Sequence, residues 1–181
     1  MRELSLHILD LIENGIRAGA TVISVTIREQ QVQDVMEVTV EDNGCGLKVP
    51  AGVATDPFFT TKEGKRTGLG LSLFRGSAER AGGSLRLRNS RLGGLCVRVR
   101  MRLSHIDRSP LGDIAGTLSS IACSNPDLDL RYRIHVGRRI FSGRSKKFAE
   151  QIPAGKRNAI AVSQILYKKI QEGLTALNVI Q

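Results

Sequence analysis

Apolar residues recur along residues 4–18 at close to the 3.6-residue period of a helix. The stripe consists of Leu4, Ile8, Leu11, Ile12 and Ala18. Further apolar residues lie between these positions and widen the stripe, which predicts a helix buried on more than one side. Glycine at position 19 is the expected left-handed stop of this helix.

The pattern then changes to the alternation of strands, with every second residue apolar over residues 22–28 and again over 35–40. A polar turn over residues 30–34 joins the two runs, which predicts a hairpin. A helix is expected over residues 71–81, followed by a glycine turn at 82–83. A second hairpin is expected over residues 84–103, with its turn at 91–94.

Residues 104–181 carry a separate set of predicted elements. Helices are expected over 111–122 and 159–177, and a hairpin is expected over 128–136 and 139–142. This order predicts a small α-β-β-α appendage that is basic at several positions. We therefore divide the chain into residues 1–103 and residues 104–181, the second part serving as a structural or partner-binding appendage.

A glycine-rich segment leads into the predicted helix at residue 71. It runs through Thr67, Gly68, Leu69, Gly70 and Leu71. Alternate glycines let the backbone approach a ligand closely, and the helix behind them directs free N–H groups and a positive dipole end toward it. Such a segment suits a phosphate, although glycine pairs also close ordinary turns.

Polar residues in the first half of the chain offer further candidate ligand groups. Asp10 and Asn14 are four apart and share a face of the first predicted helix, with Arg17 one turn further on. Asp42 ends the second predicted strand, and Gly44 and Gly46 follow it as a second place of close backbone approach.

Four sequence boxes stand in one order along the chain: DLIENGIRAGAT (residues 10–21), EDNGCGL (41–47), DPFFTTK (56–62) and TGLGLS (67–72). In this order they resemble the GHKL ATPase superfamily, which includes histidine kinases, gyrase-type topoisomerases, mismatch-repair ATPases and anti-sigma kinases. The resemblance covers residues 1–103 and implies an α+β fold, a two-layer α/β sandwich of the GHKL (Bergerat) ATP-binding type.

The same resemblance implies roles for the candidate groups, with ATP and Mg²⁺ as the ligands. Asp42 would accept a hydrogen bond from the adenine amino group, and Asn14 would be a ligand of Mg²⁺. Arg17 and Lys62 would steady phosphate charge. The remaining nucleotide-binding positions would be Gly44, Gly46, Thr67, Gly68, Leu69, Gly70 and Leu71.

The chain departs from the family pattern at its candidate catalytic residue. Members that hydrolyse ATP with a helix carboxylate place a glutamate four residues before the asparagine, whereas this chain has Asp10 there. The shorter side chain predicts slow hydrolysis, or transfer of phosphate to another acceptor. His105, followed by Asp107, Arg108 and Pro110, resembles a phosphoacceptor box, but its spacing and position favour a structural linker.

The formal net charge of +10 indicates a basic surface. Arginines alternate with apolar residues over 85–88 and 97–102, which predicts a charged sheet face that is either solvated or a docking face for an acidic protein partner. Specific nucleic-acid binding is not expected, because no aromatic residues are interleaved with these arginines. Homodimerisation remains open.

Other features indicate the cellular setting. The sequence contains no run of about 18 apolar residues, so no membrane span is expected. Acidic residues within the first apolar stretch argue against a signal peptide. Three widely spaced cysteines argue against a disulfide framework or zinc site, so we expect a cytoplasmic protein.

Two functions fit these observations. The first is an ATP-dependent regulator that transfers phosphate to a partner protein, as histidine and anti-sigma kinases do. The second is an ATP-gated binding module or slow ATPase without kinase activity, which regulates a partner complex because ATP and Mg²⁺ change its affinity for that complex. A third class, a duplex-binding ATPase, would bind DNA with a steep dependence on salt.

Overall fold

A six-stranded sheet in the order β3-β4-β2-β1-β5-β6 forms the centre of the computed structural model, which describes residues 3–47, 69–156 and 158–179. The elements along the chain are α1 (Leu4–Arg17), β1 (Val22–Gln30), β2 (Val35–Asp42), α3 (Leu69–Arg80), β3 (Ser84–Asn89), β4 (Leu95–Arg102), α4 (Ile114–Ser124), β5 (Asp129–Val136), β6 (Arg139–Arg144), α5 (Ser145–Glu150), the 3-10 helix η1 (Ala154–Lys156) and α6 (Ala159–Leu177). The helices and hairpins expected from the sequence are present, and the short helix α5 is an addition.

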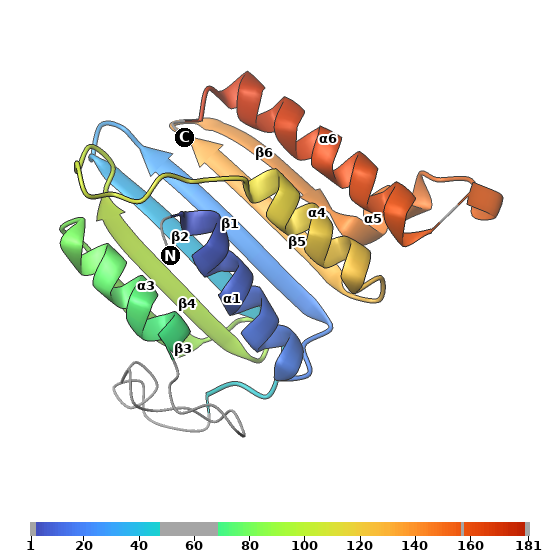
Figure 1. The fold of residues 1–181 in the computed structure, drawn as a ribbon, viewed down its shortest axis with the longest axis horizontal. Helices are drawn as coiled ribbons and strands as arrows, with labels where there is room; N and C mark the ends of the chain where they lie inside the picture. The colour runs from blue at the N-terminus through green and yellow to red at the C-terminus, as the bar shows by residue number, and fades with distance from the viewer. Residues whose placement is uncertain (1–2, 48–68, 157, 180–181) are drawn as a thin grey trace.

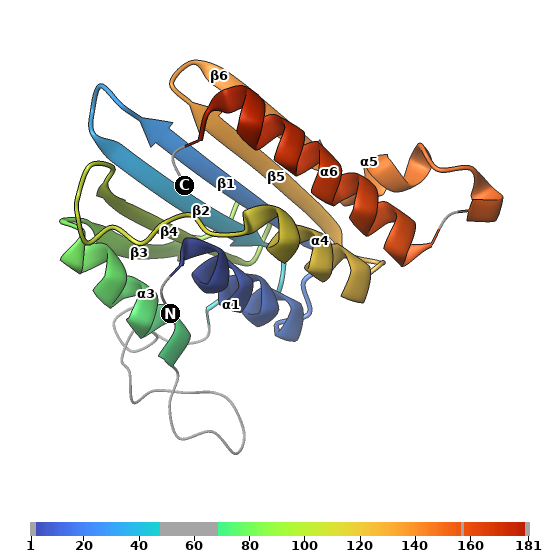
Figure 2. The same ribbon diagram turned by 45° about the horizontal axis from the view of Figure 1, so that its top comes forward.

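The helices α1, α3, α4 and α6 lie on one face of this sheet, as Figures 1 and 2 show from two directions. The two-layer α+β fold predicted from the sequence is therefore confirmed. The strand alternation explains the layering, because every second residue of β1, including Val25 and Ile27, is buried against the helices.

One hydrophobic core runs beneath all four helices. Ile8 and Ile12 of α1 are fully buried, as are Leu166 and Ile170 of α6 at the other end of the layer. Burying a side chain of this size stabilises the fold by roughly 1.5–3 kcal/mol. Because the same core includes residues from both predicted parts of the chain, the described elements after residue 103 pack as a continuation of those before it.

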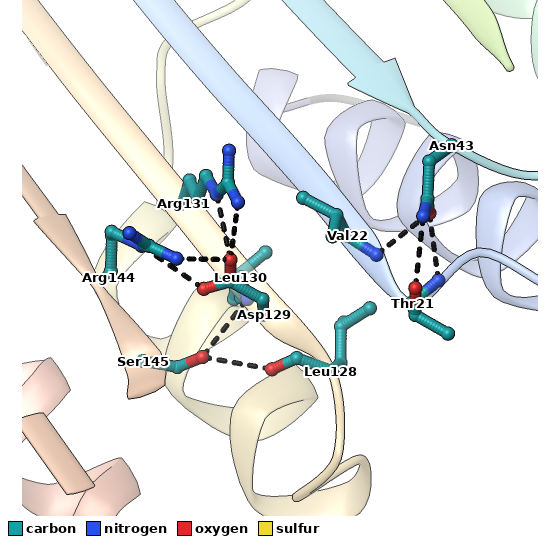
Figure 3. Close-up of polar contacts among 9 residues, drawn as sticks. All are labelled: Thr21, Val22, Asn43, Leu128, Asp129, Leu130, Arg131, Arg144 and Ser145. Atoms are coloured by element: carbon teal, nitrogen blue, oxygen red, sulfur yellow. Dashed lines mark hydrogen bonds and ion pairs between the residues drawn. The ribbon is translucent and has the colours of Figure 1, made fainter. Parts of the chain in front are cut away.

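The hairpin of β5 and β6 extends the sheet rather than standing beside it. β5 pairs in parallel with β1, and its first backbone N–H, that of Asp129, donates to the Thr21 carbonyl at 2.9 Å. In Figure 3, the Asp129 carboxylate receives hydrogen bonds from Arg131 and Arg144. The hydroxyl of Ser145 bridges the Leu128 carbonyl and the Leu130 N–H.

Burial acts against the charge of Asp129, which is 3% exposed, and alone would raise the pKa of its carboxyl group. The hydrogen bonds from Arg144 and Arg131 outweigh that effect and hold the pKa below its usual range. The carboxylate is therefore charged at neutral pH and ties the start of β5, which pairs with β1, to the end of β6.

The segment between β4 and α4 also has a structural role. The backbone carbonyls of Pro110 and Leu111 accept the N–H groups of Leu4 and Ser5, both at 2.9 Å, which satisfies donors that the first turn of α1 leaves unpaired. Within this segment, Nδ1 of His105 accepts the Asp107 N–H at 3.1 Å. His105 thus lies in a turn that follows β4, in agreement with a linker.

Among the helices of the described ranges, none is both long and apolar enough to cross a bilayer.

Candidate functional site

Asp42 is the last residue of β2, and its side chain points to the helical side of the sheet with 7% of its surface exposed. Its Oδ1 atom accepts the backbone N–H groups of Gly44 at 2.8 Å and Leu95 at 3.2 Å. No described residue bonds to Oδ2. One carboxylate oxygen is therefore held in place by the backbone, and the other, as far as the described residues go, keeps its capacity to accept a hydrogen bond.

Two glycines outside the predicted set leave space for this carboxylate. A Cβ added at Gly94 would lie 2.1 Å from Asp42 Oδ1, and a Cβ at Gly15 would lie 3.3 Å from the Asp42 Cβ. The Gly94 N–H also donates to the Asp42 carbonyl at 3.0 Å. Sequence reasoning missed Gly15, Gly94 and Leu95 as supports of Asp42, although the glycine pair in the last hairpin was a signal.

Asp10, Asn14 and Arg17 form a connected row along α1. The Asn14 Nδ2 group donates to Asp10 Oδ2 at 3.0 Å, and Asn14 Oδ1 accepts from Arg17 Nη2 at 2.6 Å. The amide orientation follows from its two partners, a carboxylate acceptor on one side and a guanidinium donor on the other. Arg17 is further held by Glu13 of the same helix at 3.4 Å, so Glu13 faces Arg17 and solvent.

The start of α3 lies directly against this row. A Cβ added at Gly70 would lie 1.7 Å from Asp10 Oδ2, so only a glycine allows the two helices to meet here. Leu71, one residue on, is partly buried against the core. The first turn of α3, which begins at Leu69, thus stands beside Asp10 at the end of this row.

Gly44 and Gly46 lie between α1 and the β3–β4 turn. A Cβ added at Gly44 would lie 2.8 Å from the Ala18 carbonyl, and Gly46 has a φ of +70° that favours glycine. The close approach observed at Gly44 is therefore to the end of α1.

Asn43, next to Asp42, fixes the start of β1. Its Oδ1 accepts the backbone N–H groups of Thr21 and Val22 at 2.9 and 2.8 Å (Figure 3). The backbone around Asp42 is consequently tied to β1 as well as to β4, which makes the position of its carboxylate rigid.

Three predicted site residues, Lys62, Thr67 and Gly68, lie outside the described residues, as does most of the third box. The described groups that converge are Asp10, Asn14, Arg17, Asp42 and Gly70, contributed by α1, β2 and α3.

The donor set fits a magnesium nucleotide better than a metal bound by protein alone. In the described ranges, no cluster of three or more His, Cys, Asp or Glu side chains is arranged to hold a metal ion. Mg²⁺ keeps several waters and is usually bound through one or two protein oxygens together with substrate phosphates. The Asn14 side chain next to Asp10 offers one such oxygen, Oδ1. This oxygen can bind the ion once the hydrogen bond from Arg17 to it is broken.

A shallow open depression elsewhere on the protein does not belong to this site. It is lined by residues around Asp34, Gly83 and Arg102, at the other end of the sheet from Asp42. No candidate residue of the four boxes lines it.

Comparison with known proteins identifies a family for this chain. Residues 2–105 match the model of a family described as histidine kinase-, DNA gyrase B-, and HSP90-like ATPases. Similar solved structures include the ATP-binding domain of PrrB from Mycobacterium tuberculosis, with 29% identity and a TM-score of 0.41 over 54% of this chain and 64% of that chain.

Two further structures are similar at lower identity. The N-terminal domain of a DNA repair protein is 12% identical, with a TM-score of 0.49 over 86% of this chain and 58% of that one. The Aquifex aeolicus MutL ATPase domain complexed with ADP is 16% identical, with a TM-score of 0.44 over 78% and 63%. The chain thus spans about three fifths of the length of each of these structures.

The family match covers more than half of the chain and includes α1, β2, α3 and the last hairpin, the elements that carry the converging residues and the supports of Asp42. The protein belongs to the family of histidine kinase-, DNA gyrase B-, and HSP90-like ATPases.

Proposed function

We propose that this protein is a cytoplasmic, Mg²⁺-dependent ATP-binding regulator that transfers the γ-phosphate to a partner protein. The observation that carries the proposal is the Asp42 carboxylate, with one oxygen fixed by backbone N–H groups and the other without a described partner. Beside it, Asn14 and the first turn of α3 supply groups suited to a metal-bound triphosphate.

Each described group has a part in binding the nucleotide. Asp42 Oδ2 accepts the adenine amino group, which selects adenine over purines that carry a carbonyl there. Asn14 Oδ1 is the protein ligand of Mg²⁺, whose charge, when the ion is bound, offsets that of the phosphates. Arg17, released from Asn14, pairs with a phosphate oxygen instead.

Asp10 is the candidate general base, but it is partly engaged. One of its carboxylate oxygens already accepts the Asn14 amide, and the side chain is packed against Gly70. A base must reach the attacking water at hydrogen-bond distance or through one further water. The arrangement supports slow hydrolysis, which leaves the nucleotide available for transfer to another protein.

Asp10→Asn is expected to lower ATP hydrolysis at least about tenfold, which is below the roughly 10²–10⁴-fold contribution of a general base because Asp10 is partly engaged, and to change ATP affinity by less than about threefold. The replacement keeps an oxygen that can accept the Asn14 amide. Steady-state release of phosphate and calorimetric titration measure the two quantities. Glu79→Gln, a matched change on the exposed side of α3 and away from the candidate residues, should leave both unchanged; unchanged turnover of Asp10→Asn would remove Asp10 from the mechanism.

Asn14→Ala is expected to abolish the increase in ATP affinity that Mg²⁺ produces in the wild-type protein. The variant lacks the amide oxygen that serves as the metal ligand, but it keeps Asp42, which binds the adenine. Calorimetric titrations with Mg²⁺ and with EDTA give the ratio of the two affinities. Asn14→Asp, which retains an oxygen at this place, should preserve a ratio above one; a full Mg²⁺ effect in Asn14→Ala would exclude Asn14 as the ligand.

The position of His105 favours an acceptor on another molecule over transfer within one chain. His105 follows the end of β4 at Arg102, whereas the site lies at Leu95, the start of that strand. At roughly 3.3 Å per residue, the two ends of this eight-residue strand are roughly 25 Å apart.

The Asp42 carboxylate also supports a second candidate function, an ATP-gated binding module without kinase activity. Incubation with γ-labelled ATP separates the two. Label that appears on a purified partner supports transfer between proteins, and acid-labile label lost in His105→Ala would indicate self-phosphorylation. Tight nucleotide binding with no label on any protein would support the binding module and contradict the kinase proposal.

A further inference from the structure

One face of the sheet lies opposite the helices (Figures 1 and 2), and the strand register places many arginines on that face. No described helix lies over this face. Cross-strand register places nine arginines on it, which together we call the arginine face: Arg28, Arg86, Arg88, Arg98, Arg100, Arg102, Arg131, Arg133 and Arg144. Only three acidic strand residues, Glu37, Glu41 and Asp129, share it.

Eight of the nine arginines form two bands separated by the central strands, and the ninth, Arg28, lies on β1 between them. One band follows β3 and β4, and the other follows β5 and β6, while β1 and β2 between them carry mostly small polar and acidic residues on this face. From β4 to β5 is three strand spacings, roughly 14 Å. The second band comes from the part of the chain after residue 103.

Several of these arginines are placed at a cost to stability. Arg86 lies directly opposite Arg98, and Arg131 lies directly opposite Arg144, and like charges in such positions repel. Arg131 and Arg144 are compensated by Asp129 between them. Arg86, by contrast, makes no ion pair within the described residues and is exposed.

The exposed arginines of both bands therefore have unused capacity for anions. Arg86 and Arg88 on β3, and Arg133 on β5, are exposed and make no ion pair with a described acid. None of the described strands contains a lysine, so arginine is the side chain that gives this face its positive charge. A planar guanidinium binds a carboxylate through two parallel hydrogen bonds, which favours a specific contact over a solvated surface.

We propose that the arginine face is the docking surface for an acidic protein segment whose carboxylates meet both bands. Glu37 and Glu41 in the middle of the face would repel the continuous phosphate charge of a nucleic acid but fit a partner with a patterned charge. No Phe, Tyr or Trp lies among the positions of this face to stack on bases. A second copy of this chain would bring arginine against arginine.

This inference specifies the partner contact of the proposed function and rests on it for the claim that the partner is regulated. Docking itself needs no nucleotide, because the arginine face is opposite the side of the sheet on which Asp10, Asn14 and Asp42 lie. The two claims can therefore be tested separately on the same protein.

The test is binding of a fluorescein-labelled, glutamate-rich 20-residue peptide, followed by anisotropy at 100 mM salt. Arg86→Glu/Arg88→Glu is expected to weaken binding at least tenfold, and Arg133→Glu, in the other band, at least threefold. The control is Lys168→Glu/Lys169→Glu on α6, which makes the same change in net charge on the helical side and should stay within twofold of the wild type. Thermal unfolding confirms that each variant is folded.

Equal losses in the two double variants would overturn the inference, because net charge alone would then explain binding. A 20-base-pair duplex or phosphatidylserine vesicles that bind more tightly than the peptide, with the same sensitivity to Arg86→Glu/Arg88→Glu, would also overturn it by showing another class of partner. Calorimetry with Mg²⁺ and ATP on the same samples tests the proposed function separately: no heat from the wild type would contradict that function and leave the peptide result standing.

Discussion

Replacing Asp42 with asparagine is expected to lower ATP affinity about a hundredfold, or roughly 2.7 kcal/mol, while the protein stays folded. An asparagine oxygen can still accept the backbone N–H groups of Gly44 and Leu95, which the Asp42 carboxylate now binds. The side-chain NH₂ group would take the place of Oδ2 and would meet the adenine amino group donor to donor.

Asp42→Asn is also expected to change which nucleotide the protein prefers. Inosine triphosphate has a carbonyl where ATP has the amino group, so the NH₂ group of Asp42→Asn can donate to it. We expect the preference for ATP over inosine triphosphate to be lost or reversed. Calorimetric titrations of both nucleotides with Mg²⁺ measure this ratio, and a variant that still prefers ATP as strongly as the wild type would show that Asp42 does not read the base.

Asp42→Ala is the less informative change, although it should also remove ATP binding. It would leave two backbone N–H groups without their acceptor, at a cost of roughly 1–3 kcal/mol each if they remain buried. Loss of binding in that variant could then reflect a displaced β3–β4 turn, so the asparagine variant carries the test.

His7 is expected to make the protein's stability fall steeply below neutral pH. The ring is 2% exposed, lies flat on Phe74 with 4.5 Å between the ring centres, and neither of its nitrogens has a hydrogen-bond partner in the described part of the chain. Burial lowers the pKa of His7 from 6.5 to about 4, because a charged imidazole is unfavourable in this contact between α1 and α3.

The direction of the effect follows from which state binds the proton. Between pH 6.5 and pH 4 the unfolded chain protonates His7 while the folded protein does not, so stability is complete above 6.5 and is lost as the pH falls. At 1.36 kcal/mol per pH unit, this histidine alone lowers the free energy of unfolding by about 3 kcal/mol.

Urea unfolding of the wild type and of His7→Phe from pH 4 to pH 7 measures this contribution. The phenylalanine keeps the ring contact with Phe74, and any cost of its larger size is the same at every pH. We expect the difference in unfolding free energy between the two proteins to change by about 3 kcal/mol over that range. His105→Ala, in a turn outside the core, serves as the control; parallel curves for the wild type and His7→Phe would contradict the prediction.

The row of side chains along α1 could be predicted from the sequence because it is local. Asp10 and Asn14 meet because they are four residues apart on one helix, whereas the contact of Gly70 with Asp10 joins two helices that are far apart in the chain. What the sequence did not reveal is how Asp42 is held, because Gly94 and Leu95 reach it across more than 50 residues of chain.

Local hydrophobic period and the order of the four boxes were enough, by themselves, to predict the helices, the hairpins, the two-layer fold and the family. Only the tertiary structure decided that β5 pairs with β1 in parallel and thereby joins the last part of the chain to the same sheet. A strand's alternation specifies which of its residues face the core but not which distant strand it pairs with. That pairing unites the two arginine bands on one surface, and the backbone contacts of Asp42 likewise arise only when β2 and β4 are brought together.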